Sequence, residues 1–328
     1  MSEKRTHVSF SSMQIFLQCP YKYKLSYLDK SEQQYSIYLD FGSAVHDAIN
    51  SWHREEVNLI DEFEINLRKY ITENQDKYSD EQKSMDIELW LQQGRKILGK
   101  IEDFLKKNYP EYTIFDTEED LNEKIDDCED LTFKGFIDVI LKHKTEEKYV
   151  LIDWKTTSYN WSREARGDPI KKMQLLLYKY FWCRKHNIDP KMVNVAFVLL
   201  KRTAKRNICE RIGMRSTDKY IDRAVEHLNK FIYGLQIERF IKNKSSCQNC
   251  QFGRWAKDDS DCEGARKFMK TEPVACKKDK VKELLVENGE KRRKRLKDLG
   301  YKDLTQEEKK SNLNTNMMIH YIENFYRK

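Results

Sequence analysis

The segment at residues 148–157 limits the possible folds of this chain more than any other stretch. Its apolar run Tyr149-Val150-Leu151-Ile152 is short and bounded by polar residues, which predicts a buried strand. Because side chains alternate along a strand, Asp153 and Lys155 should lie on the same side. A carboxylate that binds a divalent cation, beside a lysine that orients water, suits phosphodiester hydrolysis. An ordinary salt bridge at an exposed strand end would have the same pattern.

A second acid, Asp138, lies fifteen residues earlier in another stretch that resembles a strand, residues 133–140. The polar residues 141–147 predict a turn, so the two strands should form a hairpin with one acid in each arm. Adjacent strands lie about 4.8 Å apart, which would let Asp138 and Asp153 share one Mg²⁺ or Mn²⁺. Hard cations of this kind prefer carboxylate oxygens.

Five short motifs carry a resemblance to a known family, and they cover roughly residues 7–262 together with a cysteine cluster. They are Ser9-Phe10-Ser11 with Cys19-Pro20-Tyr21-Lys22-Tyr23, Gly42-Ser43-Ala44-Val45-His46, Gly135-Phe136-Ile137-Asp138, Asp153-Trp154-Lys155, and Gln174-Leu175-Leu176-Leu177-Tyr178. In this order and spacing, they resemble the RecB-like and Cas4-like exonuclease branch of the PD-(D/E)xK nuclease superfamily.

The resemblance implies an α/β fold with a restriction-endonuclease-like core, in which helices flank a central mixed sheet. A helical insertion should occupy about residues 47–108. The nuclease domain would span residues 1–245, a cysteine-rich segment residues 246–280, and a charged helical tail residues 281–328.

The resemblance also assigns roles to individual residues. The catalytic residues would be Asp138, Asp153 and Lys155, of which Lys155 would assist the water nucleophile. The Mg²⁺ or Mn²⁺ ion would be bound by His46, Asp138, Asp153 and the carbonyl of Trp154. Gln174 and Tyr178 lie one helical turn apart, on one face of a predicted helix, and would position the substrate.

Relatives often carry a glutamate on the strand that precedes the Gly-x-x-Asp motif. Glu118, Glu119 and Glu123 are the candidates in this chain, and their sequence neighbourhood does not distinguish them. A solvated acidic edge explains these residues equally well.

The cysteines predict a structural metal site. With no signal sequence evident, the eight cysteines are expected in a reducing compartment, where clustered thiols usually bind metals. In one interpretation, which the resemblance supplies, Cys19, Cys247, Cys250 and Cys262 hold a [4Fe–4S] cluster that fastens the two ends of the nuclease domain together. In the other, Cys247, Cys250, Cys262 and Cys276 bind Zn²⁺.

Charge and apolar patterning narrow the function further. The net charge of +7 fits a polyanionic partner, and no apolar run is long enough to cross a membrane, so we expect an intracellular, cytoplasmic protein. The compact, lysine-rich chain is also compatible with a viral origin.

Residues 94–101 imitate a P-loop but lack its final Ser or Thr and follow no strand, so we reject a nucleotide site there.

The sequence therefore predicts a metal-dependent DNA exonuclease that acts on DNA ends or single strands in replication, recombination or repair. A recombination or replication protein would be a suitable partner. The alternatives are a non-catalytic DNA-binding module on a nuclease fold and a nuclease directed at RNA.

Overall fold

The structure is a computed structural model, and it describes residues 6–31, 35–55, 57–126 and 128–252 of the 328-residue chain. The chain divides into two units, Met1–Phe268 and Met269–Lys328, and all described residues belong to the first. The predicted domain boundary near residue 245 lies close to the end of the described part. The boundary near residue 280 and the predicted tail lie outside it, so the domain limits stay predictions.

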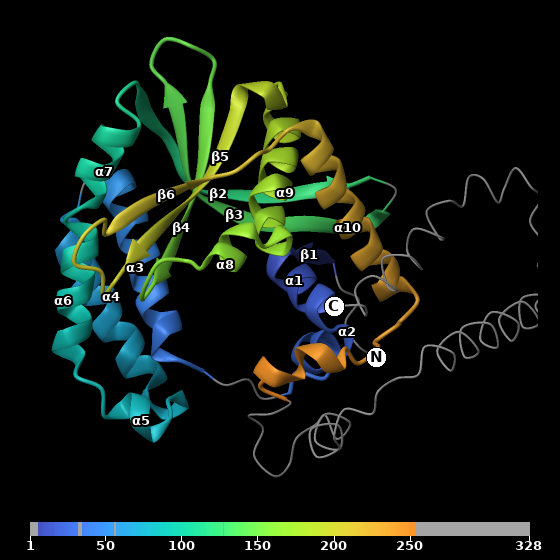
Figure 1. Cartoon of the computed structure of the whole chain (residues 1–328), viewed down its shortest axis with the longest axis horizontal. Helices are drawn as coiled ribbons and strands as arrows, with labels where there is room; N and C mark the ends of the chain where they lie inside the picture. Colours follow the sequence, from blue (N-terminus) through green and yellow to red (C-terminus); the bar gives the residue numbers. More distant parts are fainter. Residues whose placement is uncertain (1–5, 32–34, 56, 127, 253–328) are drawn as a thin grey trace, which may run out of the picture. The chain divides into compact units, whose positions relative to one another are not determined.

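Six strands form one mixed sheet, which confirms the predicted α/β architecture (Figure 1). The strand order is β1-β3-β4-β5-β6, and β2 pairs with the other edge of β3. The β1–β3 and β4–β5 pairs are parallel, and the other pairs are antiparallel. The bounds are β1 (His7–Ser9), β2 (Tyr112–Ile125), β3 (Cys128–His143), β4 (Tyr149–Thr157), β5 (Val193–Lys201) and β6 (Cys209–Gly213).

The sheet opens where β3 and β4 separate. Their antiparallel pairing runs only from Lys142–Tyr149 to Val139–Ile152, whereas β4 stays paired with β5 as far as Thr157–Lys201. Further along the same edge of β3, β1 pairs with residues 132–134. Residues 135–138 of β3 therefore have no ladder partner on this edge among the described strands. We call this opening the fork, and Figure 1 shows β2 and β3 diverging from β4 and β5 beyond it.

The helices of residues 37–108, which precede β2 in the chain, cover one face of the sheet. They pack on alternate side chains of β3, β4 and β5, such as Val139, Ile152 and Val198, to form one hydrophobic core. Their bounds are α3 (Ile37–Glu55), α4 (Leu59–Asn74), 3-10 helix η2 (Gln75–Lys77), α5 (Asp80–Lys83), α6 (Ile87–Leu98) and α7 (Ile101–Asn108). The predicted helical insertion is thus present, although its first residues belong to α3, which begins ten residues before the expected boundary.

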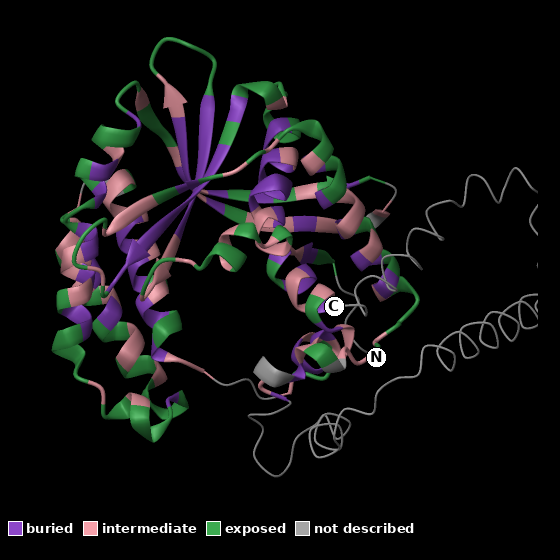
Figure 2. Ribbon diagram, in the orientation of Figure 1, coloured by how far each residue is buried: buried purple, intermediate pink, exposed green. Residues whose placement is uncertain are grey.

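A second core lies on the opposite face and includes residues of β1, α1, α9 and α10. The long helices here are α1 (Phe10–Gln18), α9 (Pro169–His186) and α10 (Asp218–Gln236). Strand β5 contributes Phe197 to this core and Val198 to the other, as its near-continuous apolar sequence predicts. Figure 2 shows that most of this strand is buried. The shorter elements are α2 (Pro20–Tyr23), π-helix η1 (Lys24–Leu28), α8 (Arg163–Gly167), and 3-10 helices η3 (Pro190–Met192) and η4 (Lys244–Asn249).

Gly94 explains the false resemblance to a P-loop. It lies inside α6, where an added Cβ would fall 2.0 Å from the ring of Phe63 on α4, so glycine is needed for close helix packing. This placement agrees with rejecting a nucleotide site. Within the described part of the chain, no helix is both long and apolar enough to span a membrane.

Candidate active site

Two carboxylates, one buried and one largely buried, mark the fork. Asp138 and Asp153 each lie one residue beyond the last β3–β4 pair, Val139 and Ile152. The side chain of Asp138 is 11% exposed and that of Asp153 is 3% exposed. The predicted hairpin with an acid in each arm is confirmed. However, the two acids face the opening between the strands and do not belong to a continuous ladder.

Lys155 lies beside Asp153, as the strand alternation predicts. Its Nζ is 2.7 Å from Asp153 Oδ2. Burial raises the pKa of Asp153 to about 6, although the Lys155 ammonium favours the ionised carboxylate. Burial opposes the charged form of Lys155, but the Asp153 and Asp138 carboxylates outweigh it and raise the pKa of the lysine. Lys155 therefore stays protonated and can stabilise negative charge.

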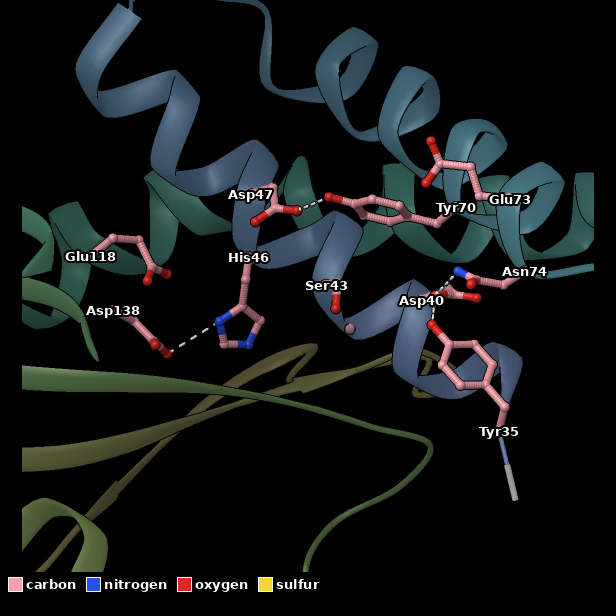
Figure 3. A pocket seen from close by; sticks show the side chains of 11 residues that line it. Tyr35, Asp40, Ser43, His46, Asp47, Tyr70, Glu73, Asn74, Glu118 and Asp138 are labelled. Carbon is pink, nitrogen blue, oxygen red and sulfur yellow. Dashed lines mark hydrogen bonds and ion pairs between the residues drawn. The ribbon is translucent and has the colours of Figure 1, made fainter. Parts of the chain in front are cut away.

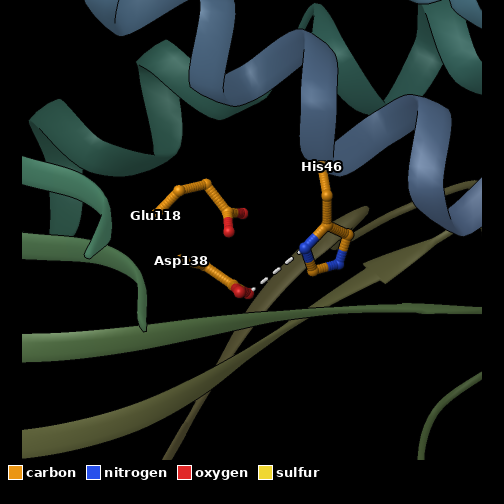
Figure 4. A group of neighbouring side chains, drawn as sticks. All are labelled: His46, Glu118 and Asp138. Carbon is orange, nitrogen blue, oxygen red and sulfur yellow. Dashed lines mark ion pairs between the residues drawn. The ribbon is translucent and has the colours of Figure 1, made fainter. Parts of the chain in front are cut away.

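His46 reaches Asp138 from α3 across the fork. The distance from His46 Nδ1 to Asp138 Oδ2 is 3.4 Å (Figure 4). Burial alone would lower the pKa of His46, but the Asp138 carboxylate outweighs burial and raises that pKa to about 9. Burial would raise the pKa of Asp138, yet His46, Lys155 and the amide of Trp154 together lower it. Asp138 is therefore ionised at neutral pH.

Trp154 contributes its backbone amide in this structure. Its N–H donates a hydrogen bond of 2.6 Å to Asp138 Oδ2 and so holds the carboxylate across the fork. Its indole lies on the opposite face from Asp153 and Lys155, buried in the core under α3 and α7. Binding of a metal by the Trp154 carbonyl stays a prediction.

Glu118 on β2 completes a cluster with His46 and Asp138. One potential ligand atom from each residue lies within 4.8 Å of the others. Burial, with a smaller contribution from Asp138, raises the pKa of Glu118 to about 7. Of the three glutamates named above, the structure places Glu118 at the fork, and neither of the other two belongs to the cluster found among the described residues.

The backbone at Glu118 explains this selection. Glu118 has a φ of 48°, in the left-handed region that side chains other than glycine rarely adopt. On one side of it, Thr117 donates a hydrogen bond to Asn50 of α3. On the other side, Glu119 accepts a hydrogen bond from Trp182 of α9. Residues two apart on a strand normally share a face, so the left-handed residue reverses the alternation here. Such strain is typical of functional sites.

The donor atoms suit a divalent cation. His46, Glu118 and Asp138 offer one imidazole nitrogen and carboxylate oxygens, the ligands that Mg²⁺ and Mn²⁺ take in proteins. Asp153 Oδ2 is buried without an aligned hydrogen bond, although the Lys155 ammonium is near. A bound cation would satisfy a buried acceptor that lacks a hydrogen bond. Asp153 is not close enough to all three of the others to belong to their group.

A cavity of about 610 Å³ opens on the α3 side of the cluster (Figure 3). Its lining includes five acids, Asp40, Asp47, Glu73, Glu118 and Asp138. Fixed negative charges attract cations and repel phosphates. This cavity is therefore suited to hydrated cations and unfavourable for phosphate groups.

Two of these acids hold α3 against the helices that follow it. Asp40 is buried and accepts hydrogen bonds from the hydroxyls of Tyr35, at 2.6 Å, and Tyr78. Asp47 accepts one from the hydroxyl of Tyr70. These contacts fix the helix that carries His46. The sequence did not single out either acid, since their tyrosine partners lie up to 38 residues away.

Gln174 and Tyr178 lie on α9, on the opposite side of β3. The ring of Tyr178 covers Gly135, where an added Cβ would lie 2.7 Å from it. Gln174 Nε2 donates a hydrogen bond of 3.4 Å to the Tyr178 hydroxyl. Burial, together with the charge of Asp153, raises the pKa of Tyr178. Tyr178 is largely buried, so in this structure it supports the strand, and the substrate-positioning role of the pair stays a prediction.

The two ends of the described chain meet at the predicted cysteine site. The Asn243 amide donates to Cys19 Sγ at 3.3 Å, and the Cys247 thiol contacts the Asn243 carbonyl at 3.8 Å. Cys247 and Cys250 are buried in one small apolar cluster. Among the described residues, no three cysteines have their sulfurs within 4.8 Å of one another. Cys262 and Cys276 lie outside the described residues, so the cluster and the zinc site both stay predictions.

The chain is similar to a known protein family and to solved structures. A family model described as PD-(D/E)XK nuclease superfamily matches residues 7–255. A crystal structure of a candidate exonuclease from Eubacterium rectale is similar, with 12% identity, a TM-score of 0.49, and coverage of 77% of this chain and 90% of that one. The structure of SSO0001 gives 14% identity, a TM-score of 0.35, and coverage of 77% and 86%. No curated protein matches.

Proposed function

Because the chain belongs to the PD-(D/E)XK nuclease superfamily and has its restriction-endonuclease-like fold, we propose that it is a Mg²⁺- or Mn²⁺-dependent DNA exonuclease. It would hydrolyse phosphodiester bonds at DNA ends or in single strands during replication, recombination or repair. The observation that carries the proposal is the pair of buried acids at the fork, with Lys155 beside one of them and His46 beside the other.

Each residue has a distinct task in this proposal. His46, Glu118, Asp138 and Asp153 would hold the cation, with the Trp154 carbonyl as a further ligand. The bound cation would polarise the phosphate and lower the pKa of a coordinated water. The Lys155 ammonium, kept charged by the two acids, orients the attacking water and offsets the negative charge that develops on the phosphate. Gln174 and Tyr178 would position the substrate strand from the α9 side.

The cysteines would stabilise the fold and take no part in cleavage. In our proposal, Cys19, Cys247, Cys250 and Cys262 ligate a [4Fe–4S] cluster, and the meeting of Cys19 with the segment around Asn243 supports a site that joins the two ends of the domain. Anaerobic purification followed by iron, sulfide and zinc analysis tests this. About four irons per chain support the cluster. One zinc without iron would replace it by a Zn²⁺ site that includes Cys276.

Cleavage assays with matched variants test the nuclease proposal. Asp153→Asn and Lys155→Ala should each reduce Mg²⁺-dependent cleavage of end-labelled DNA at least about 100-fold, because both groups stabilise the transition state. Asp126→Asn is the control, since Asp126 is exposed and bonds with Arg184 and Tyr180 of α9, away from the acids of the fork. Full activity in both active-site variants would refute the assignment.

The choice of substrates separates the remaining alternatives. An exonuclease degrades linear strands and spares circular single strands of the same sequence, whereas cleavage of circles would indicate endonuclease activity. Preference for an RNA strand would redirect the proposal to RNA. Tight DNA binding by the wild-type protein without cleavage in Mg²⁺ or Mn²⁺ would indicate the non-catalytic binding module.

A further inference from the structure

A row of three side chains runs along β3 towards the fork. Phe133 and Ile137 point into the α9 core, and Gly135 lies under Tyr178, so the residues between them face the other side. Lys134 and Phe136 therefore face the α3 side of the strand, and Asp138 lies on the same side, since it contacts His46 and lines the cavity there. Same-face neighbours on a strand are about 6.8 Å apart, so this row leads from the surface to the active site.

Phe136 is the exposed member of the row. Its side chain is 45% exposed, and Lys134 Nζ lies 5.8 Å from the centre of its ring. A single exposed aromatic residue is ordinary on a protein surface, so exposure alone has no meaning here. The position of this one is distinctive, because Phe136 belongs to residues 135–138 at the open edge of β3, two residues before a proposed metal ligand.

We propose that Phe136 stacks on a nucleobase of a single-stranded DNA segment whose neighbouring phosphate lies at Asp138, and that Lys134 contacts a phosphate further along the strand. This inference rests on the proposed nuclease function and specifies how the substrate is held. An exposed aromatic ring stacks on any base, since every base has a π face, and a lysine beside it binds the backbone without reading sequence.

The charge distribution around the fork favours this path. The cavity lies on the same face of β3, but its lining includes Asp47 and Glu73, which would repel a phosphodiester backbone, whereas Lys134 and Phe136 do not line it. The opposite face of β3 is closed by Tyr178 over Gly135. The Lys134–Phe136 row is the approach that combines a positive charge, an exposed aromatic ring and continuity with Asp138.

The chain contains a matched control for this pair. Phe115 on β2 is 47% exposed, and Lys142 Nζ lies 5.8 Å from its ring centre, so its exposure and lysine contact match those of Phe136. Its neighbour Lys142 is four residues from Asp138 along β3, about 14 Å at the usual rise per residue, where β3 is paired with β4. Phe115 therefore lies away from the open edge of β3.

Steady-state kinetics on a single-stranded oligonucleotide test the proposal. Phe136→Ala should raise KM between about fivefold and about a hundredfold, the loss expected for one stacked base, with kcat nearly unchanged. Phe136→Trp should restore KM, and Phe115→Ala should leave it unchanged. Lys134→Met should reduce the slope of log binding constant against log salt by about 0.7, the value for one phosphate on a single strand.

A substrate scan identifies the stacked base directly. An abasic residue is moved along the oligonucleotide, and binding is measured in the Asp153→Asn background so that the strand stays intact. At one position, the abasic residue should weaken binding as much as Phe136→Ala does and cause no further loss in that variant. If Phe136→Ala and Phe115→Ala behave alike while the wild-type protein cleaves DNA, the stacking role is refuted and the nuclease proposal stands. If the wild-type protein neither binds nor cleaves DNA, both are refuted.

Discussion

Replacing Gly135 with alanine tests the packing that supports the active-site strand. The new Cβ would lie 2.7 Å from one ring carbon of Tyr178 and 3.1 Å from its hydroxyl oxygen, closer than carbon atoms pack. Tyr178 is 7% exposed and is held in the α9 core, so its ring has little room to move. Either the ring or β3 must shift, immediately beside Asp138.

The expected cost follows from two opposing contributions. Overpacking a filled core costs about 1–3 kcal/mol. Replacing glycine by alanine inside a strand returns about 0.5–1 kcal/mol, because glycine loses more backbone freedom on folding. We therefore expect Gly135→Ala to lower the free energy of unfolding by about 1 kcal/mol, measured by urea denaturation.

The sign of the effect should reverse when the ring is removed. In a Tyr178→Leu background, the alanine methyl has space, so Gly135→Ala should stabilise the protein by about 0.5–1 kcal/mol. Gly167→Ala is the control, because an added Cβ there meets nothing within 4 Å. If Gly135→Ala were neutral in the wild-type chain, or destabilising to the same degree in both backgrounds, the proposed contact with Tyr178 would be wrong.

Three further predictions concern charged groups. The folded-state pKa of His46 is raised from 6.5 to about 9, so its stabilising contribution should be complete below pH 6.5 and lost as the pH rises through 9. The free energy of unfolding, measured with urea from pH 6 to 10, should therefore decline by up to about 3 kcal/mol, and His46→Gln should abolish this decline. Mn²⁺ at a hundred times its Kd should stabilise the wild-type protein by about 2.7 kcal/mol, measured as a higher Tm. Glu118→Gln should reduce this Tm shift at the same Mn²⁺ concentration, and chelation with EDTA should remove it. Lys201 is 2% exposed and contacts Glu210 at 2.9 Å and Asn160 at 2.7 Å, so Lys201→Met should lower the free energy of unfolding by about 2 kcal/mol, and an unchanged urea midpoint would contradict this.

Local patterns in the sequence predicted much of the site. The shared face of Asp153 and Lys155 follows from the two-residue period of a strand, and the hairpin with Asp138 follows from the short polar turn between two apolar runs. Both relations join residues that are close in sequence, so a single sequence is enough to predict them. The antiparallel pairing of the two strands that carry the acids is likewise a relation between segments close in sequence.

Features that depend on long-range contacts or on an unusual backbone conformation could not be predicted from the sequence. Glu118, and not Glu119, faces His46 and Asp138 because of one left-handed backbone conformation at residue 118. The residue type at that position does not predict this conformation. The fork depends on where β1 replaces β4 along β3, a relation between segments more than 120 residues apart. The acidic cavity depends on how α4 packs on α3, which periodicity alone does not specify.

The fork also has a consequence for the order in which the protein matures during synthesis. Asp153 and Lys155 lie on the part of β4 that is no longer paired with β3. This part of the strand is held by its parallel pairing with β5 on the other edge. Parallel strands require a long crossover, and such non-local pairs form slowly. A ribosome-bound chain that has not yet released residue 201 therefore lacks the support that aligns these two side chains. The enzyme should gain its cleavage activity late, after most of the domain has emerged and folded.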